Sequence, residues 1–136
     1  MKDTISSVHK KENQQTKIIK WDDIIYALQT IVNKYSFKII SNKYIAIYGV
    51  PRGGKVVAVV LSHMLDIPIL ERFEPKIATR ILVVDDIVDS GATLNAMKRL
   101  YPHTHFLSIY VKEKATTPEY YYEILPQNIW VKFCWE

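Results

Sequence analysis

The amino-acid sequence predicts an α/β fold with an open, mainly parallel sheet flanked by helices. Three apolar runs carry this prediction, and each is typical of a buried strand: residues 44–48, 81–84 and 105–111. The first two runs are each followed by a turn rich in small residues and then by a helical pattern. Strands that alternate with helices in this way usually form a parallel sheet.

The length and composition indicate one globular domain. The chain has 136 residues, of which 49% are hydrophobic and 24% are charged. We expect a single domain at residues 17–136, preceded by a polar N-terminal extension at residues 1–16 that lacks periodicity. The sequence shows neither a signal peptide nor an apolar run long enough to span a membrane, and it holds one cysteine, Cys134. We therefore expect a cytoplasmic protein without a membrane partner.

The basic character of the chain is concentrated near its start. The formal net charge is +4, and residues 1–20 hold five lysines against Asp3 and Glu12, so that the remainder is close to neutral. A short basic tail on a near-neutral domain is explained by solvated lysines. We expect no nucleic-acid partner.

The first elements follow from local pattern. Residues 16–20 are typical of a short edge strand. A helix is then predicted to open at Trp21, with Asp22 and Asp23 in its first turn, where the helix dipole favours acidic side chains. The apolar stripe of this helix consists of Ile24, Leu28, Ile31 and Tyr35.

A glycine-rich loop follows the strand at residues 44–48. It runs Gly-Val-Pro-Arg-Gly-Gly-Lys over residues 49–55, and a helix is predicted over 56–65. The spacing of Gly49, Gly54 and Lys55 matches a nucleotide-binding P-loop. Val56 stands where such a loop has the Ser or Thr that holds Mg²⁺, so the match to a P-loop is incomplete. A short strand at 68–70 and a connection at 71–80 lead to the next segment.

The strand at residues 81–84 introduces the most informative stretch of the chain. Two carboxylates, Asp85 and Asp86, follow at the point where the strand is expected to end. A turn of small and polar residues comes next, and a helical pattern begins at Leu94. Backbone N–H groups at the start of a helix bind phosphate, and paired carboxylates bind ribose hydroxyls or Mg²⁺. An ordinary strand-to-helix connection with a capped helix is the alternative.

Residues 81–93 resemble the phosphoribosyl-pyrophosphate (PRPP) signature of the type I phosphoribosyltransferases. This signature is a hydrophobic strand followed by two acidic residues, two apolar residues, Asp, Thr or Ser, Gly, a small residue and Thr. Ala92 stands where the family most often has Gly. The Pro-Arg-Gly-Gly element at 51–54 resembles the pyrophosphate loop of the same family.

Two further segments, 101–112 and 125–136, are similar to the xanthine-guanine type of purine phosphoribosyltransferase. That group has a Tyr-Pro…His-Phe strand ending in Lys, here Lys112, and a Pro-Gln…Trp segment that closes on Pro-Trp-Glu or Pro-Trp-Asp. Cys134 replaces the usual Pro.

The resemblance implies the type I phosphoribosyltransferase fold and an enzyme of purine salvage. The reaction would convert a 6-oxopurine base (guanine, xanthine or hypoxanthine) and PRPP to the nucleoside 5′-monophosphate and pyrophosphate. Mg²⁺ is the implied cofactor, and a homo-oligomer, dimer or tetramer, is the implied assembly.

The same resemblance implies a role for each matching residue. PRPP and its phosphates would be bound by Arg52, Gly53, Asp85, Asp86, Asp89, Ser90, Gly91, Ala92 and Thr93. Asp85 and Asp86 would hold the ribose hydroxyls and the metal. Asp89 would accept a proton from the purine ring, which makes these three aspartates the expected catalytic residues. The purine would be bound by Lys112, Trp130 and Val131. A solvated lysine and a core tryptophan are the alternatives for Lys112 and Trp130.

One departure from the family leaves a second function open. Most members insert a long mobile lid where this chain has only residues 71–80. Arg72, Lys76 and Arg80 are either phosphate contacts or part of a solvated loop. An unshielded site favours the alternative of a PRPP- or nucleotide-binding regulatory module with little or no turnover. A phosphorelay receiver domain is a more distant candidate, because it needs its acidic pair on the first strand.

Overall fold

The structure of the protein is a computed structural model that describes residues 15–37 and 41–136. Within these residues the central sheet has five parallel strands in the order β3-β2-β4-β5-β6. Their bounds are β2 Ala46–Gly49, β3 Ile69–Leu70, β4 Ile81–Val88, β5 His105–Lys112 and β6 Tyr120–Leu125. A second, two-stranded parallel sheet pairs β1 (Gln15–Ile19) with β7 (Ile129–Phe133). The predicted open parallel sheet is confirmed.

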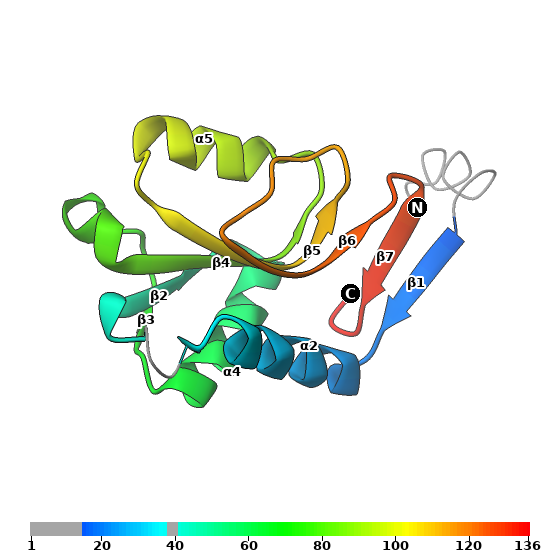
Figure 1. The fold of residues 1–136 in the computed structure, drawn as a ribbon, viewed down its shortest axis with the longest axis horizontal. Helices are drawn as coiled ribbons and strands as arrows, with labels where there is room; N and C mark the ends of the chain where they lie inside the picture. The colour runs from blue at the N-terminus through cyan, green and yellow to red at the C-terminus, as the bar shows by residue number, and fades with distance from the viewer. Residues whose placement is uncertain (1–14, 38–40) are drawn as a thin grey trace.

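Helices cover both faces of the central sheet (Figure 1). The helices α2 (Trp21–Lys34) and α4 (Gly53–Leu65) lie on one face, and α5 (Ala92–Leu100) lies on the other. Two short 3₁₀ helices, η1 (Ser41–Lys43) and η2 (Pro75–Arg80), precede β2 and β4. The connection between β3 and β4 at residues 71–80 therefore contains the 3₁₀ helix η2, which the sequence did not predict.

The strand β4 separates the two halves of the core. Leu82 and Val84 belong to the larger apolar cluster, which includes residues of α2 and α4, whereas Ile81 and Val83 belong to the smaller cluster that includes Leu94 of α5. All four β4 side chains are 0% exposed. This confirms the prediction that the strand is buried on both faces.

The helix α2 forms as its sequence predicts. It begins at Trp21, and the N–H of Lys20 donates a hydrogen bond of 2.8 Å to Oδ2 of Asp23. This bond uses one of the free backbone donors at the start of the helix. The predicted stripe faces the core, because Ile24, Leu28 and Ile31 are fully buried.

Three predicted element bounds are corrected by the structure. β4 does not end before the acidic pair but continues to Val88, because its pairing with β5 extends to Val88 opposite Val111. β2 covers Ala46–Gly49 instead of residues 44–48, and α4 begins at Gly53 instead of residue 56. In each case backbone pairing, or the helix, reaches further toward the polar loop than the apolar pattern does.

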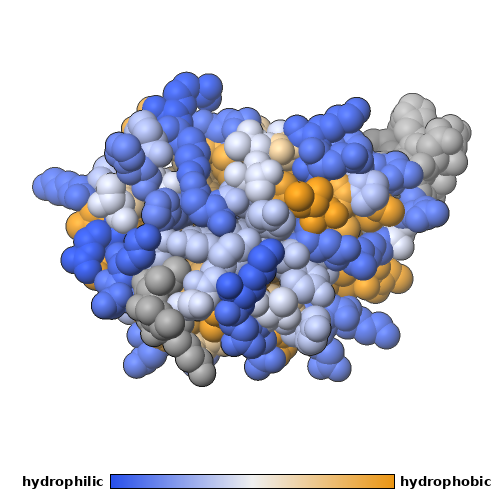
Figure 2. All heavy atoms as spheres, in the orientation of Figure 1, coloured by the Kyte–Doolittle hydropathy of each residue, from blue (hydrophilic) through white to orange (hydrophobic). Residues whose placement is uncertain are grey.

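The predicted N-terminal extension, residues 1–16, lies mostly outside the described residues, and its last two residues belong to β1. Among the described helices, none has the length and apolar character needed to cross a membrane. The surface in Figure 2 is largely hydrophilic, and its apolar side chains stand in separate patches.

Candidate active site

The predicted site residues gather at one edge of the central sheet. The strands β2, β4 and β5 are neighbours and parallel, so their carboxyl ends meet at this edge. The Pro-Arg-Gly-Gly loop follows β2, the acidic signature occupies the end of β4, and Lys112 ends β5. Open parallel sheets bind ligands at such an edge.

A cavity of about 140 Å³ lies between the end of β4 and the start of α5. It is lined by Asp85, Ile87, Val88, Asp89, Ser90, Gly91, Thr93, Leu94 and Phe106. The structure therefore brings together five predicted site residues, while Ala92 and Asp86 are not among those that line the cavity. The first turn of α5 adjoins the cavity, where free N–H groups and the helix dipole favour an anion.

Gly91 makes the sharp turn from β4 into α5. Its φ of +85° lies in the left-handed region, a backbone conformation that residues with a Cβ atom adopt only at a cost in free energy. The hydroxyl of Ser90 accepts a hydrogen bond of 3.2 Å from the N–H of Ala92, which holds the turn from the other side. The turn is thus shaped by short-range contacts.

The acidic pair is half-buried within β4 and is held by its own backbone. Oδ1 of Asp85 accepts a bond of 2.8 Å from the N–H of Asp86, and Oδ1 of Asp86 accepts one of 2.8 Å from the N–H of Ile87. Burial and a hydrogen bond to Asp86 raise the pKa of Asp85 from 3.8 to about 8. Burial likewise raises the pKa of Asp86.

A divalent cation fits this pair. The ion pairs found among the described residues join Lys98 to Glu119 and Lys112 to Asp89, and neither reaches Asp85 or Asp86. Two adjacent carboxylates without a cationic partner offer the hard oxygen ligands that Mg²⁺ prefers. In the described part of the chain, no group of three or more His, Cys, Asp or Glu could hold a metal, so substrate and water oxygens would complete the coordination.

The Pro-Arg-Gly-Gly loop is pressed against the acidic pair. A Cβ atom on Gly53 would lie 1.9 Å from Oδ2 of Asp86, so this position accepts only glycine without a shift. Arg52 is exposed and directly precedes α4, and its peptide bond with Pro51 is cis. A guanidinium and the first turn of a helix are suited to bind phosphate groups.

Lys112 is a buried cation that joins β5 to two other segments. Its side chain is 5% exposed, and its ammonium nitrogen lies 3.7 Å from Oδ1 of Asp89. The same nitrogen donates a hydrogen bond of 3.3 Å to the backbone carbonyl of Gln127. Lysine is rarely buried without partners, and the solvated alternative for Lys112 is therefore wrong.

The other two predicted purine contacts lie on β7. Trp130 is 37% exposed, so it is not a core tryptophan. Val131 is 8% exposed and packs into the larger core cluster, which leaves its backbone as the part that can contact a ligand. Trp21 and Trp135 pack against each other with ring centroids 5.8 Å apart.

Sequence reasoning did not identify Phe106 and Gln127. Phe106 lines the cavity beside the turn but lies on β5, and only the sheet order places it there. Gln127 lies in the Pro-Gln segment, yet no periodicity or spacing indicates that its carbonyl meets Lys112. Both depend on contacts between residues distant in sequence.

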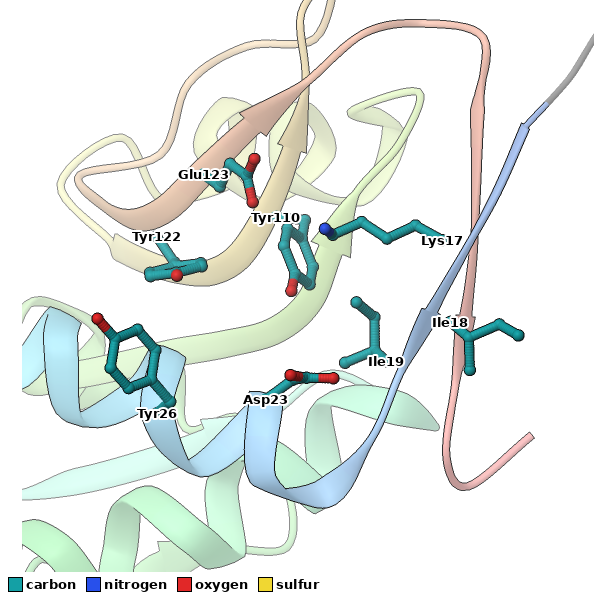
Figure 3. A pocket seen from close by; sticks show the side chains of 8 residues that line it. All are labelled: Lys17, Ile18, Ile19, Asp23, Tyr26, Tyr110, Tyr122 and Glu123. Atoms are coloured by element: carbon teal, nitrogen blue, oxygen red, sulfur yellow. The ribbon is translucent and has the colours of Figure 1, made fainter.

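A second cavity, of about 240 Å³, lies where β1 and α2 meet β5 and β6 (Figure 3). Its lining includes Tyr26, Tyr110 and Tyr122, with the charged side chains of Lys17, Asp23 and Glu123 around them. The rings of Tyr26 and Tyr122 meet edge to face at 6.3 Å. None of the predicted site residues lines this cavity, so it is separate from the candidate active site.

Comparison with known proteins supports the interpretation of the fold and the motifs. The chain is 32% identical to a xanthine-guanine phosphoribosyltransferase from Cereibacter sphaeroides, and the match covers 67% of this chain and 68% of that protein. Among solved structures, a purine phosphoribosyltransferase from Pyrococcus horikoshii superposes with a TM-score of 0.70 at 26% identity, covering 89% of this chain and 94% of that one.

A third similar protein shows the same fold. The xanthine-guanine-hypoxanthine phosphoribosyltransferase from Helicobacter pylori has a TM-score of 0.68 at 21% identity, over 90% of this chain and 92% of that one. No model of a protein family matches the chain. The parallel sheet, with the loops of the candidate site along its carboxyl edge, defines an α/β protein of the kind that binds ligands at that edge. The chain belongs to the type I phosphoribosyltransferase family.

Proposed function

We propose that the protein is a purine phosphoribosyltransferase that joins a 6-oxopurine base to PRPP, releasing pyrophosphate. The observation that carries this proposal is the contact between Lys112 and Asp89. A buried ammonium lies 3.7 Å from a carboxylate that itself borders the cavity at the first turn of α5. A hydrogen-bond donor, Lys112, and a proton acceptor, Asp89, for a purine base thus lie beside a cavity that can hold a phosphate group. The names of the relatives from C. sphaeroides and P. horikoshii support the same reaction.

The 5′-phosphate of PRPP belongs in the cavity between β4 and α5. Ser90, Gly91 and Thr93 line it, and the helix dipole of α5 favours a dianion at this end. The volume of about 140 Å³ suits a group of phosphate size together with its bound water.

The ribose and the pyrophosphate belong between this cavity and the Pro-Arg-Gly-Gly loop. Asp85 lines the cavity and Oδ2 of Asp86 lies against Gly53 of the loop, so both carboxyl groups can accept hydrogen bonds from ribose hydroxyls. Arg52 and the N–H groups after it would bind the pyrophosphate. Mg²⁺, held by Asp85 and Asp86 with substrate oxygens, would supply positive charge to the leaving group.

The base belongs next to Lys112, with the exposed ring of Trp130 as a stacking surface. An ammonium donates hydrogen bonds and accepts none, so Lys112 selects a 6-oxo group over a 6-amino group. The backbone of Val131 is a further contact for the purine.

The reaction exchanges two bonds at the anomeric carbon. The bond from this carbon to the pyrophosphate oxygen breaks, and both of its electrons leave with pyrophosphate. A ring nitrogen of the purine forms the new bond, and the proton it loses passes to the carboxylate of Asp89. Positive charge develops on the ribose in the transition state, and Asp85 and Asp86 would stabilise it in their ionised form, which a bound cation favours. The remaining task of the site is to position two ligands.

A turnover assay tests this proposal. The protein is incubated with PRPP, Mg²⁺ and guanine, xanthine, hypoxanthine or adenine in turn, and the monophosphate is measured. We expect product with at least one 6-oxopurine and little with adenine. If PRPP binds but no purine yields a nucleotide, the alternative of a regulatory binding module replaces the enzyme.

We also propose a homo-oligomer, a dimer or tetramer. Ile18 of β1 and Tyr26 of α2 are each more than 60% exposed and line the same cavity, and contiguous apolar surface is commonly covered at subunit interfaces. Sedimentation or light scattering measures the assembly directly.

A further inference from the structure

Gln127 forms a junction between the end of β5 and the start of β7. Three of its polar groups contact three consecutive residues. Its backbone carbonyl accepts a bond of 3.3 Å from the ammonium of Lys112. Its N–H donates a bond of 2.6 Å to Oε2 of Glu113, and its side-chain oxygen Oε1 accepts a bond of 3.2 Å from the N–H of Lys114.

This junction is stiffened on both sides. The N–H of Glu113 donates a bond of 2.9 Å to the carbonyl of Leu125, and the N–H of Ile129 donates one of 3.2 Å to the carbonyl of Pro126. The turn between β6 and β7 is therefore fixed to the segment that follows Lys112.

The junction lies between two parts of the proposed base site. Lys112 is on one side of Gln127, and β7, which carries Trp130 three residues further on, is on the other. A shift of Gln127 moves the acceptor that orients the ammonium, and it also moves the start of the strand that carries the ring. The turn at Ser90 and Gly91 lies near Ala115 and Thr116, and none of the hydrogen bonds that Gln127 makes among the described residues reaches this turn.

We infer that Gln127 is a positioning residue for base selection, with Glu113 as its partner. This inference rests on the proposed function. The side chain of Gln127 holds the turn so that its backbone carbonyl aims the ammonium of Lys112 at a 6-oxo group. The bonds at Gln127 thus serve the choice between 6-oxo and 6-amino purines, and they do not serve PRPP binding.

The test compares Gln127→Met with the wild type. Methionine keeps the length and shape of the side chain and removes the acceptor for the N–H of Lys114. Calorimetry measures the affinities for GMP, AMP and pyrophosphate. We expect GMP affinity to fall by about fivefold, from the loss of one neutral hydrogen bond, and the preference for GMP over AMP to fall with it. Affinity for pyrophosphate stays unchanged.

Three further variants separate this role from general destabilisation. Glu113→Ala breaks a different bond of the same junction and is expected to shift the GMP preference in the same direction. Gln127→Glu keeps an acceptor and is expected to lie closer to the wild type than Gln127→Met. Gln29→Met makes the same chemical change at an exposed position of α2 and is expected to change nothing. Melting temperatures confirm that each variant is folded.

The outcomes distinguish this inference from the proposed function. An unchanged preference for GMP over AMP in Gln127→Met and Glu113→Ala overturns the inference, as does an equal loss of GMP and pyrophosphate affinity. A wild-type protein that binds GMP but forms no nucleotide refutes the proposed enzyme and leaves the role of Gln127 measurable. A wild-type protein that does not bind GMP overturns both.

Discussion

The acidic pair gives the protein a pH-dependent stability whose sign follows from the structure. Burial and the neighbouring Asp86 raise the pKa of Asp85 from 3.8 to about 8. Between these values the folded chain keeps a proton that the unfolded chain has released, so the free energy of unfolding falls as pH rises. The largest possible slope for one group is about 1.4 kcal/mol per pH unit. Because Asp85 is partly exposed, we expect a total of about 1–2 kcal/mol between pH 5 and pH 8.

Asp85→Asn removes this titration and keeps the local hydrogen bond. The amide oxygen of asparagine can still accept the 2.8 Å bond from the N–H of Asp86. Urea denaturation at pH 5, 6, 7 and 8 is expected to show the variant gaining stability over the wild type as pH rises. Asp66→Asn is the control, because this exposed residue has a left-handed φ of 56° that asparagine also tolerates. If the free energies of unfolding of Asp85→Asn and the wild type follow parallel curves against pH, burial does not raise the pKa of Asp85 as described.

Three further predictions concern the ligands. Lys112→Ala should lower the ratio of kcat/KM for guanine over adenine by roughly 10- to 150-fold, since a charge-assisted hydrogen bond is lost; an unchanged ratio removes Lys112 from the base site. Gly53→Ala should weaken PRPP binding by roughly 10- to 100-fold in a calorimetric titration, because the new Cβ would lie 1.9 Å from Oδ2 of Asp86, so that either the loop or this carboxylate must move from its place in the site. Arg52→Gln should weaken pyrophosphate binding by about tenfold and reduce its salt dependence, and equal salt slopes would contradict the predicted contact.

The sequence predicts the elements with strong local patterns. The four aliphatic residues of β4 are recognisable as a continuous apolar run, and the stripe on α2 is recognisable because burial repeats with the period of the helix. The end of β4 is different. Asp85 and Asp86 are charged, so the pattern stops at Val84, yet pairing with β5 carries the strand to Val88. The number of β4 residues that pair depends on the neighbouring strand, and the local sequence pattern of β4 holds no information about that strand.

The site divides in the same way. The turn at Gly91 and the glycine at position 53 are local signals, and their positions were predictable. The approach of Lys112 to Asp89 and to the carbonyl of Gln127 required the order of the strands and the path of the β6–β7 turn. The pairing of β1 with β7 joins opposite ends of the chain, and no pattern within either strand names its partner.

The central claim is that the acidic signature on β4 is a PRPP site, and one titration tests it most directly. PRPP is titrated calorimetrically, with Mg²⁺ present, into the wild type and into the double variant Asp85→Asn with Asp86→Asn. The account predicts binding to the wild type and a loss of at least about tenfold in the variant, with no fall in its melting temperature at pH 8. Equal PRPP affinity in the two proteins would contradict it.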